Sequence, residues 1–290
     1  MTVVVNTGDD FRHLGLHIAP DVDTVLYTLS GLASPERGWG RRDETFTFMA
    51  ALATLGGPDW FTLGDGDLAM HVLRTARLAS GESLTSVTTA LADRLAVKAR
   101  ILPMCDAPVA TMLDTDEGLL PFQDYFVRCK CRPVVRAIAY IGADAAALTR
   151  EVAGVLAAPE LAAVMICPSN PWLSIDPILA VTGMRAALRR CPAPKVAVSP
   201  IIAGSAVKGP TAKIMDELGL ERDCRSIARH YAGLIDGLIV DDADAGSLAS
   251  LGVAGLATAT LMQTLADKIA LAKTTLAFAS RLGAAARGAP

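Results

Sequence analysis

The sequence is poor in aromatic residues and has no excess of positive charge. Phe, Trp and Tyr make up 5% of its 290 residues, whereas hydrophobic residues of all kinds make up 52%. A core built mainly from Ala, Val, Leu and Ile is typical of helices packed on a parallel sheet rather than of a β-sandwich. The formal net charge is −3, so we expect no broad basic surface and no nucleic-acid partner.

Signatures of several other protein classes are also missing. The six cysteines form no Cys-x-x-Cys pair and show no zinc-like spacing with histidine, so we expect free thiols. No G-x-G-x-x-G fingerprint follows a strand, which argues against a dinucleotide-dependent oxidoreductase. The four histidines are scattered, and nothing in their spacing indicates a covalent nucleophile.

The sequence also shows no segment that would direct it to a membrane. Met1 leads directly into a run of valines, without the basic region that opens a signal peptide. No apolar run reaches spanning length without a proline or a charge. These features predict a cytoplasmic protein with no membrane partner.

The sequence contains strand-like and helix-like segments that alternate along much of the chain. Residues 2–6 form a short β-branched run that stops at polar turn residues, as expected for a buried parallel strand. Further strands are expected at 109–114, 119–131, 136–141, 162–167, 195–199 and 237–240, with a hairpin joining the first two. Helices are expected at 144–157, 176–190, 211–218, 223–232 and 255–284. This order predicts an α/β protein with a mostly parallel sheet, in a single domain over residues 1–290.

Early in the chain, several helical patterns follow one another without strands between them. They cover residues 23–32, 43–56, 67–79 and 83–96. We therefore expect an inserted helical lobe within residues 30–100. The last helical pattern, residues 255–284, is rich in Ala and Leu. It could supply the surface of a homodimer, or it could simply pack on the core.

Aspartates gather just after the first expected strand. The motifs NTGDD at 6–10 and PDVDT at 20–24 place four of them within fifteen residues: Asp9, Asp10, Asp21 and Asp23. Loops at the carboxyl ends of strands are where open α/β sheets bind ligands. Hard oxygen ligands of this kind hold Mg²⁺, which in turn binds phosphate oxygens. The alternative is that these aspartates only stabilise turns and cap helices.

A second motif, PERGWGRRDET at 35–45, sets Trp39 between two glycines and close to three arginines. Arginine binds phosphate through two parallel hydrogen bonds, and tryptophan stacks on flat rings. Trp39 and Arg42 are therefore candidates for substrate contact. The alternative is an exposed loop whose arginines lie in water.

Two more polar segments follow later strands. PSNP at 168–171 offers Ser169 and Asn170, next to the start of a helix, as donors to a phosphate or a nucleotide. Residues 199–213 combine small residues with Lys208 and Lys213, although the spacing of a Walker A loop is absent. The alternatives are a proline-bounded turn and an ordinary glycine-containing loop. All these segments together suggest direct displacement at phosphorus, driven by positioning and charge neutralisation.

In this order, the motifs resemble those of the 2-phospho-L-lactate transferase family (CofD/FbiA-like). The stretch DWFTLGDGDLAMHVLRT at 59–75 adds to the resemblance, which covers about residues 2–240. It implies a Rossmann-like core with helices on both faces of the sheet and a helical lobe. The implied activity is a Mg²⁺-dependent step in the biosynthesis of coenzyme F-420.

The resemblance also implies the substrates. A phospho-lactyl, phosphoenolpyruvyl or phosphoglyceryl group would pass from a guanosine-diphosphate-activated donor to the deazaflavin Fo, and GMP would leave. Asp9 and Asp10 would be catalytic, and Asp9, Asp10 and Asp23 would bind the metal. The residues implied to contact the substrates are Asp21, Asp23, Trp39, Arg42, Ser169, Asn170 and Lys208.

One feature departs from the family pattern. The family begins with a strand and a glycine-rich turn that binds nucleotide phosphates, whereas this sequence begins at what resembles the second strand. On that reading, the phosphate site would lose backbone donors. The alternative function is that of a non-enzymatic regulator of the same superfamily that binds a nucleotide-sugar. Phe11-Arg12-His13-Leu14 after the first aspartates, and the loop at Trp39, favour the transferase.

Overall fold

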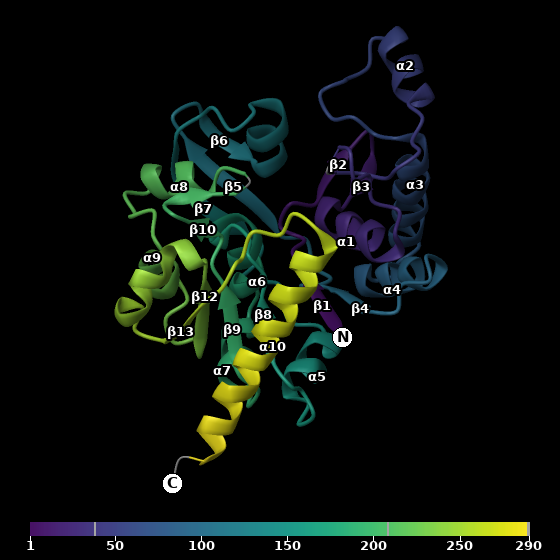
Figure 1. Ribbon diagram of the computed structural model, residues 1–290. Helices are drawn as coiled ribbons and strands as arrows, with labels where there is room; N and C mark the ends of the chain where they lie inside the picture. Colours follow the sequence, from purple (N-terminus) through teal and green to yellow (C-terminus); the bar gives the residue numbers. More distant parts are fainter. Residues whose placement is uncertain (38, 208, 289–290) are drawn as a thin grey trace. The chain divides into compact units, whose positions relative to one another are not determined.

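A computed structural model describes residues 1–37, 39–207 and 209–288 (Figure 1). It is a mixed α/β structure with parallel strands and many helices, so the predicted class is confirmed. The chain forms two compact units, which we describe separately. The first comprises Met1–Val152 and Ala180–Thr182, and the second comprises Ala153–Leu179 and Gly183–Pro290. The predicted single domain and the predicted bounds of its lobe stay predictions.

The first unit begins with two short pairs of strands. β1 (Thr2–Val5) pairs in parallel with β4 (Arg100–Pro103), which the sequence reading did not predict. β2 (Phe11–His13) and β3 (Leu16–Ile18) form an antiparallel hairpin. Its two-residue loop, Leu14-Gly15, has φ values of 52° and 78°, which match the twist of the adjoining strands.

Four helices cover this part of the chain. They are α1 (Pro20–Ser30), α2 (Thr47–Thr54), α3 (Asp65–Ala79) and α4 (Leu84–Arg94). Proline opens α1 with aspartates in its first turn, and Gly31 ends it in the left-handed conformation. Buried side chains of α1 and α4, such as Leu26 and Val87, pack with Val5 of β1 in one hydrophobic core. In contrast, α2 has no buried residue.

A three-stranded antiparallel sheet completes the first unit. Its order is β6 (Gly118–Pro121), β5 (Ala110–Thr115) and β7 (Val135–Ile141), so the predicted hairpin between the first two is confirmed. The predicted strand at 119–131 is wrong beyond Pro121. There the chain forms a single turn of π-helix, η1 (Asp124–Arg128), and then two residues with positive φ, which no strand allows.

The second unit is built on a parallel sheet. Its strands lie in the order β13 (Ala254–Ala257), β12 (Gly237–Val240), β9 (Lys195–Val198) and β8 (Val164–Ile166). The helices around it are α5 (Arg150–Ala157), whose first residues belong to the first unit, η2 (Pro171–Ile175), α6 (Asp176–Ala180), α7 (Met184–Arg190), α8 (Thr211–Glu217), α9 (Cys224–His230), η3 (Asp242–Ser250) and α10 (Leu265–Gly288). A small hairpin joins β10 (Ile201–Ile202) and β11 (Ser205–Ala206).

The long helix α10 packs against this sheet (Figure 1). Phe278 and Leu271 of α10 share a core with Val196 and Ile239 of the strands. The approach is close at Gly237, where an added Cβ would lie 2.6 Å from the Phe278 ring. The sequence alternative in which the terminal helix packs on the core is therefore confirmed, whereas the homodimer stays a prediction.

Three predicted helices differ most from the structure in their bounds. The helix expected at 255–284 is wrong at its start, because residues 254–257 form β13 and the helix begins at Leu265. The helix expected at 176–190 is two helices, separated at Gly183, whose φ is 90°. The helix expected at 144–157 begins only at Arg150. Across the described residues, no helix is both long enough and apolar enough to cross a bilayer.

Candidate active site

The turn that follows β1 is organised by Asn6. Its side-chain oxygen accepts a hydrogen bond from the N–H of Gly8 at 2.7 Å, which closes a tight turn. Its side-chain nitrogen donates to Oδ2 of Asp21 at 3.0 Å. Asn6 therefore ties the end of β1 to the first turn of α1, and it brings the two aspartate motifs of the sequence together.

Three carboxyl groups of these motifs influence one another. Burial raises the pKa of Asp9 well above 3.8, and the charges of Asp21 and Asp10 raise it further. Burial also raises the pKa of Asp10 well above its ordinary value, against the lowering effect of Arg74. The pKa of Asp21 is raised by burial as well, although its hydrogen bond from Asn6 lowers it. Without a cation, the folded chain therefore favours protonation of these carboxyl groups.

Some buried oxygens of this turn lack a hydrogen-bond donor. They are Oδ1 of Asp9, Oδ1 of Asp10 and Oγ1 of Thr7. Buried acceptors in folded proteins are nearly always satisfied, so such a group indicates a missing ligand. Oxygen atoms of carboxylate and hydroxyl groups are the hard ligands that Mg²⁺ prefers. In their chemistry, the residues after β1 therefore fit a divalent cation.

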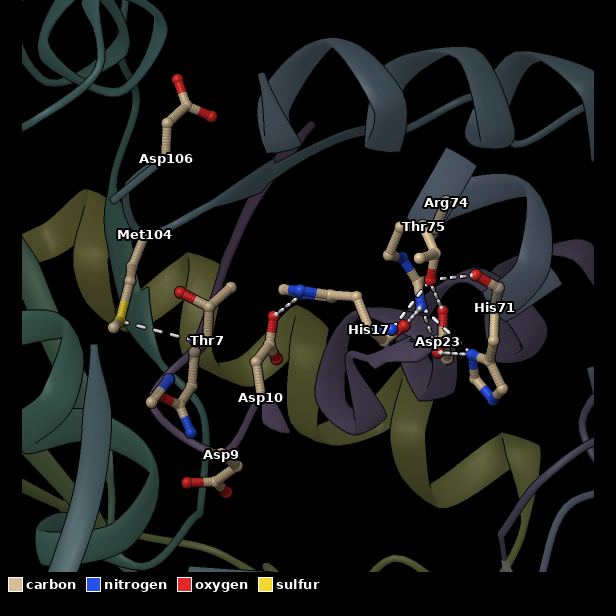
Figure 2. A network of polar contacts seen from close by, with 12 residues as sticks. Thr7, Asp9, Asp10, His17, Asp23, His71, Arg74, Thr75, Met104 and Asp106 are labelled. Carbon is tan, nitrogen blue, oxygen red and sulfur yellow. Dashed lines mark hydrogen bonds and ion pairs between the residues drawn. The ribbon is translucent and has the colours of Figure 1, made fainter. Parts of the chain in front are cut away.

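The fourth aspartate of the motifs, Asp23, is already paired (Figure 2). Arg74 of α3 donates to both of its carboxylate oxygens, through Nη1 at 3.1 Å and through Nη2. The Arg74 side chain has no exposed surface, and Asp23 is 4% exposed. The pair is therefore a buried ion pair with two parallel hydrogen bonds, a strong and directional arrangement.

The Arg74 pair extends into a larger polar network. His71 lies 3.2 Å from Arg74 through Nδ1 and 3.3 Å from Oδ1 of Asp67 through Nε2. Tyr27 donates to the same oxygen of Asp67 at 2.5 Å. Each titratable group in this cluster thus has a partner within the cluster.

Asp23, Asp67 and His71 could in principle hold a metal, since their ligand atoms lie within 4.8 Å of one another. However, the guanidinium of Arg74 already supplies a positive charge at this place. A dication beside a buried guanidinium would meet like-charge repulsion in a poorly solvated environment. At Asp23, Asp67 and His71, Arg74 thus already supplies the positive charge that a metal ion would bring.

His17 contacts both clusters, Asp10 through its side chain and Arg74 through its main-chain carbonyl oxygen. Nε2 of His17, on β3, lies 3.0 Å from Oδ2 of Asp10. Figure 2 shows His17 reaching from the side of Arg74 and His71 to Asp10. The sequence reading gave His17, His71 and Arg74 no role. The signal that could have found His71 and Arg74 is their spacing from Asp67, which places the three polar groups on one face of a helix.

The loop that contains PERGWGRRDET is anchored on α3. Both carboxylate oxygens of Glu44 accept hydrogen bonds from the first turn of that helix, from the N–H of Gly66 at 2.7 Å and of Asp67 at 2.9 Å. Trp39 is 52% exposed and lies near the guanidinium of Arg37. The Arg42 side chain is 57% exposed and pairs with its neighbour Asp43. The structure thus gives this loop a clear anchor and leaves Trp39 and Arg42 on its surface.

Two further predicted residues, Ser169 and Asn170, belong to the second unit. Ser169 and Asn170 follow β8. The side-chain oxygen of Asn170 accepts hydrogen bonds from the N–H groups of Trp172 and Leu173, both at 3.0 Å, and so caps η2. Its Nδ2 is buried without a partner. Lys208 lies outside the described residues.

Comparisons with known proteins point to one family. The family described as "2-phospho-L-lactate transferase CofD" matches residues 1–254. A protein from Streptomyces griseus named phosphoenolpyruvate transferase is 42% identical over 263 residues, which cover 88% of this chain and 82% of the relative. A protein of the same name from Kitasatospora aureofaciens is 42% identical over 292 residues, with coverages of 97% and 90%. One from Mycobacterium ulcerans is 41% identical over 265 residues, with coverages of 87% and 80%.

Solved structures show a similar fold. A member of the UPF0052 family from Bacillus halodurans superposes with a TM-score of 0.58, covering 93% of this chain and 89% of the other. A second structure of a Bacillus halodurans protein gives a TM-score of 0.59, with coverages of 95% and 91%. The sequence identity is 15% in both cases, so this likeness concerns the fold alone.

Proposed function

Because the chain belongs to the 2-phospho-L-lactate transferase family CofD, which makes it a transferase of phosphate-containing groups, we propose that it acts in the biosynthesis of coenzyme F-420. The proposed donor is a three-carbon acid activated by guanosine diphosphate, and the proposed acceptor is the deazaflavin Fo. The observation that carries this proposal is the buried carboxyl cluster after β1, with its raised pKa values and unpartnered oxygens.

The proposed reaction is a displacement at phosphorus. The terminal ribityl hydroxyl of Fo attacks the phosphorus that carries the three-carbon acid. A new P–O bond forms, the bond from that phosphorus to the bridging oxygen breaks, and GMP leaves with this oxygen. The proton of the hydroxyl passes to the carboxylate of Asp9 or Asp10, which acts as the general base.

We propose that Asp9, Asp10 and Asp21 hold Mg²⁺, which would neutralise charge on the phosphate oxygens. Asp10 and Asp9 each offer a buried oxygen with no competing donor. Asp23 was the third metal ligand expected from the sequence. We now prefer Asp21, because both oxygens of Asp23 already accept hydrogen bonds from Arg74.

Among the three-carbon groups, we favour phosphoenolpyruvyl over phospholactyl and phosphoglyceryl. The support is the name of the relatives, which are called phosphoenolpyruvate transferases at 41–42% identity. These groups differ by few atoms, so a direct comparison of the donors decides between them.

The other residues that the resemblance implies keep their proposed roles. Trp39 and Arg42 would contact substrate from the loop anchored on α3. Ser169, Asn170 and Lys208 would contact the nucleotide, and the unpartnered Nδ2 of Asn170 supports this role. A cytoplasmic location and a homodimer also remain proposals.

The experiment that tests the function is a titration of purified protein with Fo, followed by deazaflavin fluorescence. The titration is repeated with GDP, with Mg²⁺ and with both. We expect GDP and Mg²⁺ together to strengthen binding, since Mg²⁺ would neutralise the charge that GDP brings close to the acceptor. Turnover is then measured with each activated donor, and release of GMP is quantified.

Absence of Fo binding by a folded sample would refute the proposed acceptor. Fo binding without GMP release from any of the three donors would refute the proposed donor. Asp9→Asn serves as the variant in which GMP release is lost while the fold is retained, because asparagine keeps the shape of the side chain.

A further inference from the structure

We propose that His17 is a positioning residue for Asp10: its Nε2–H holds one oxygen of Asp10, so that the other oxygen faces the cation, and the polar face of α3 fixes His17 in turn. This inference rests on the proposed function, because it assigns Asp10 to the metal. It concerns residues outside the motif aspartates themselves, and it rests on the contacts drawn in Figure 2.

The two oxygens of Asp10 have different environments. Oδ2 lies 3.0 Å from Nε2 of His17, whereas Oδ1 is buried and has no hydrogen-bond partner. A carboxylate held through one oxygen presents the other in a fixed direction. This is how groups around a metal site orient the ligands that bind the metal directly.

The chemistry of His17 fits a donor at Nε2. An imidazole carries a proton on at least one ring nitrogen, and a protonated ring nitrogen donates a hydrogen bond. Asp10 is acceptor-only when it binds a cation, so the proton of His17 must then lie on Nε2.

The main chain of His17 is held on two sides. On one side, β3 pairs with β2, with His17 opposite Arg12. On the other side, the N–H of His17 donates to Oγ1 of Thr75 at 2.8 Å, and Nη1 of Arg74 donates to the carbonyl oxygen of His17 at 3.4 Å. Thr75 itself donates to the carbonyl oxygen of His71 at 2.7 Å. Helix α3 thus satisfies both backbone groups that β2 leaves open.

The spacing of these α3 residues explains why they act together. His71, Arg74 and Thr75 stand at positions i, i+3 and i+4, which lie on one face of a helix. Arg74 and His71 are nearly fully buried, so this face has little freedom to move. The same face that pairs Asp23 therefore sets the position of His17, and through His17 that of Asp10.

The test compares His17→Gln with His17→Asn. A glutamine amide nitrogen can occupy the place of Nε2 and donate to Asp10, whereas the shorter asparagine reaches only the place of Nδ1. Binding of Mn²⁺ is measured by electron paramagnetic resonance of the free ion, and steady-state kinetics are measured alongside over a series of Mg²⁺ concentrations. We expect His17→Asn to weaken Mn²⁺ binding by about 10- to 100-fold, as is usual when a partner of a metal ligand is removed.

The two variants then separate positioning from a role in folding. His17→Gln should bind Mn²⁺ within about threefold of the wild type, which is small against the 10- to 100-fold loss expected for a missing partner. In His17→Asn, the Mg²⁺ concentration needed for half-maximal rate should rise and kcat should fall. KM for Fo should stay unchanged, because His17 acts through Asp10. Thermal unfolding without metal should be nearly the same for both variants.

A second pair of variants independently tests the hydrogen bond by which α3 holds the main chain of His17. Thr75→Ser keeps the hydroxyl that accepts from His17, and Thr75→Val removes it while it keeps the shape. We expect weaker Mn²⁺ binding in Thr75→Val and near wild-type binding in Thr75→Ser.

The outcomes distinguish this inference from the proposed function. If the wild type binds Mn²⁺ and both His17 variants bind it equally well, the inference is wrong and the metal site stands. If both His17 variants lose binding equally, the hydrogen bond from Nε2 is not what matters, and the inference is again wrong. If the wild type itself binds neither Mn²⁺ nor Mg²⁺, the metal-dependent function fails.

Discussion

Replacement of Arg74 by methionine should destabilise the first unit strongly. Arg74 has no exposed surface and donates to both oxygens of Asp23, which is itself 4% exposed. Methionine fills much of the same volume but leaves the Asp23 carboxylate buried without the positive charge of the arginine side chain. Removal of one partner of a buried ion pair costs about 3–5 kcal/mol. For a unit of this size, that corresponds to a fall in Tm of roughly 6–20 °C.

The assay is thermal unfolding followed by circular dichroism, with a cycle of variants. Arg74→Met is combined with Asp23→Asn, which removes the stranded charge. If the cost arises from the charge, the double variant should be clearly more stable than the sum of the two single effects, with a coupling of about 1–3 kcal/mol. Arg77→Met on the same helix is the control, because its partner Glu82 is at the surface and such pairs contribute little.

Two results would refute this reasoning. The first is a Tm of Arg74→Met close to that of Arg77→Met, which would show that the buried pair contributes no more than an exposed one. The second is strict additivity in the cycle, which would show that Asp23 does not depend on Arg74. Either result would also remove the basis for choosing Asp21 over Asp23 as a metal ligand.

Three further predictions concern other parts of the chain. Asp9→Asn should raise the Tm of the metal-free protein at pH 7 and abolish the rise in Tm on adding Mg²⁺. The pKa of Asp9 in the folded protein lies above its ordinary 3.8, so the stability that this group contributes at low pH is lost as pH rises through the folded pKa. The loss in free energy of unfolding is about 1.4 kcal/mol for each unit of pKa difference. Thermal unfolding of both proteins over a series of pH values checks this. Glu44→Ala should cost about 1 kcal/mol by removing a cap, and it should speed hydrogen exchange at the amides of Gly66 and Asp67. Gly237→Ala should lower the Tm, because the new Cβ would meet the Phe278 ring at 2.6 Å; overpacking costs about 1–3 kcal/mol, and adding Phe278→Leu should restore part of it.

Part of the local structure around the candidate site could be predicted from local sequence. Turn residues after a β-branched strand, followed by Pro20 and aspartates in a first helical turn, are local signals, and the structure has a strand, a turn and a helix there. The roles of Asp9, Asp10 and Asp21 stay proposals. The enzyme class and the family were also predictable, because the motifs are specific when they occur in a fixed order. The family comparison and the named relatives confirm both.

The errors lie where distant parts of the chain decide the local conformation. Residues 254–257 have a sequence that favours helix, yet they form a strand because β12 pairs with them along its length. Residues 122–131 alternate like a strand but form a π-helical turn. The role of His17 depends on the turn at Leu14-Gly15, which folds β3 back along β2, and on a helix more than fifty residues away. No pattern within a short window contains that information.

The contacts that anchor the Trp39 loop all converge on the start of one helix. Glu44 holds two amide groups of the first turn of α3, and Asp65 at the start of that helix accepts hydrogen bonds from Thr45, Thr47 and Phe48. These hydrogen bonds fix the backbone of the loop to the first turn of the helix. The later turns of the same helix carry His71, Arg74 and Thr75. One helix therefore holds the backbone that follows Trp39 at its start and contacts Asp23 and the main chain of His17 further along.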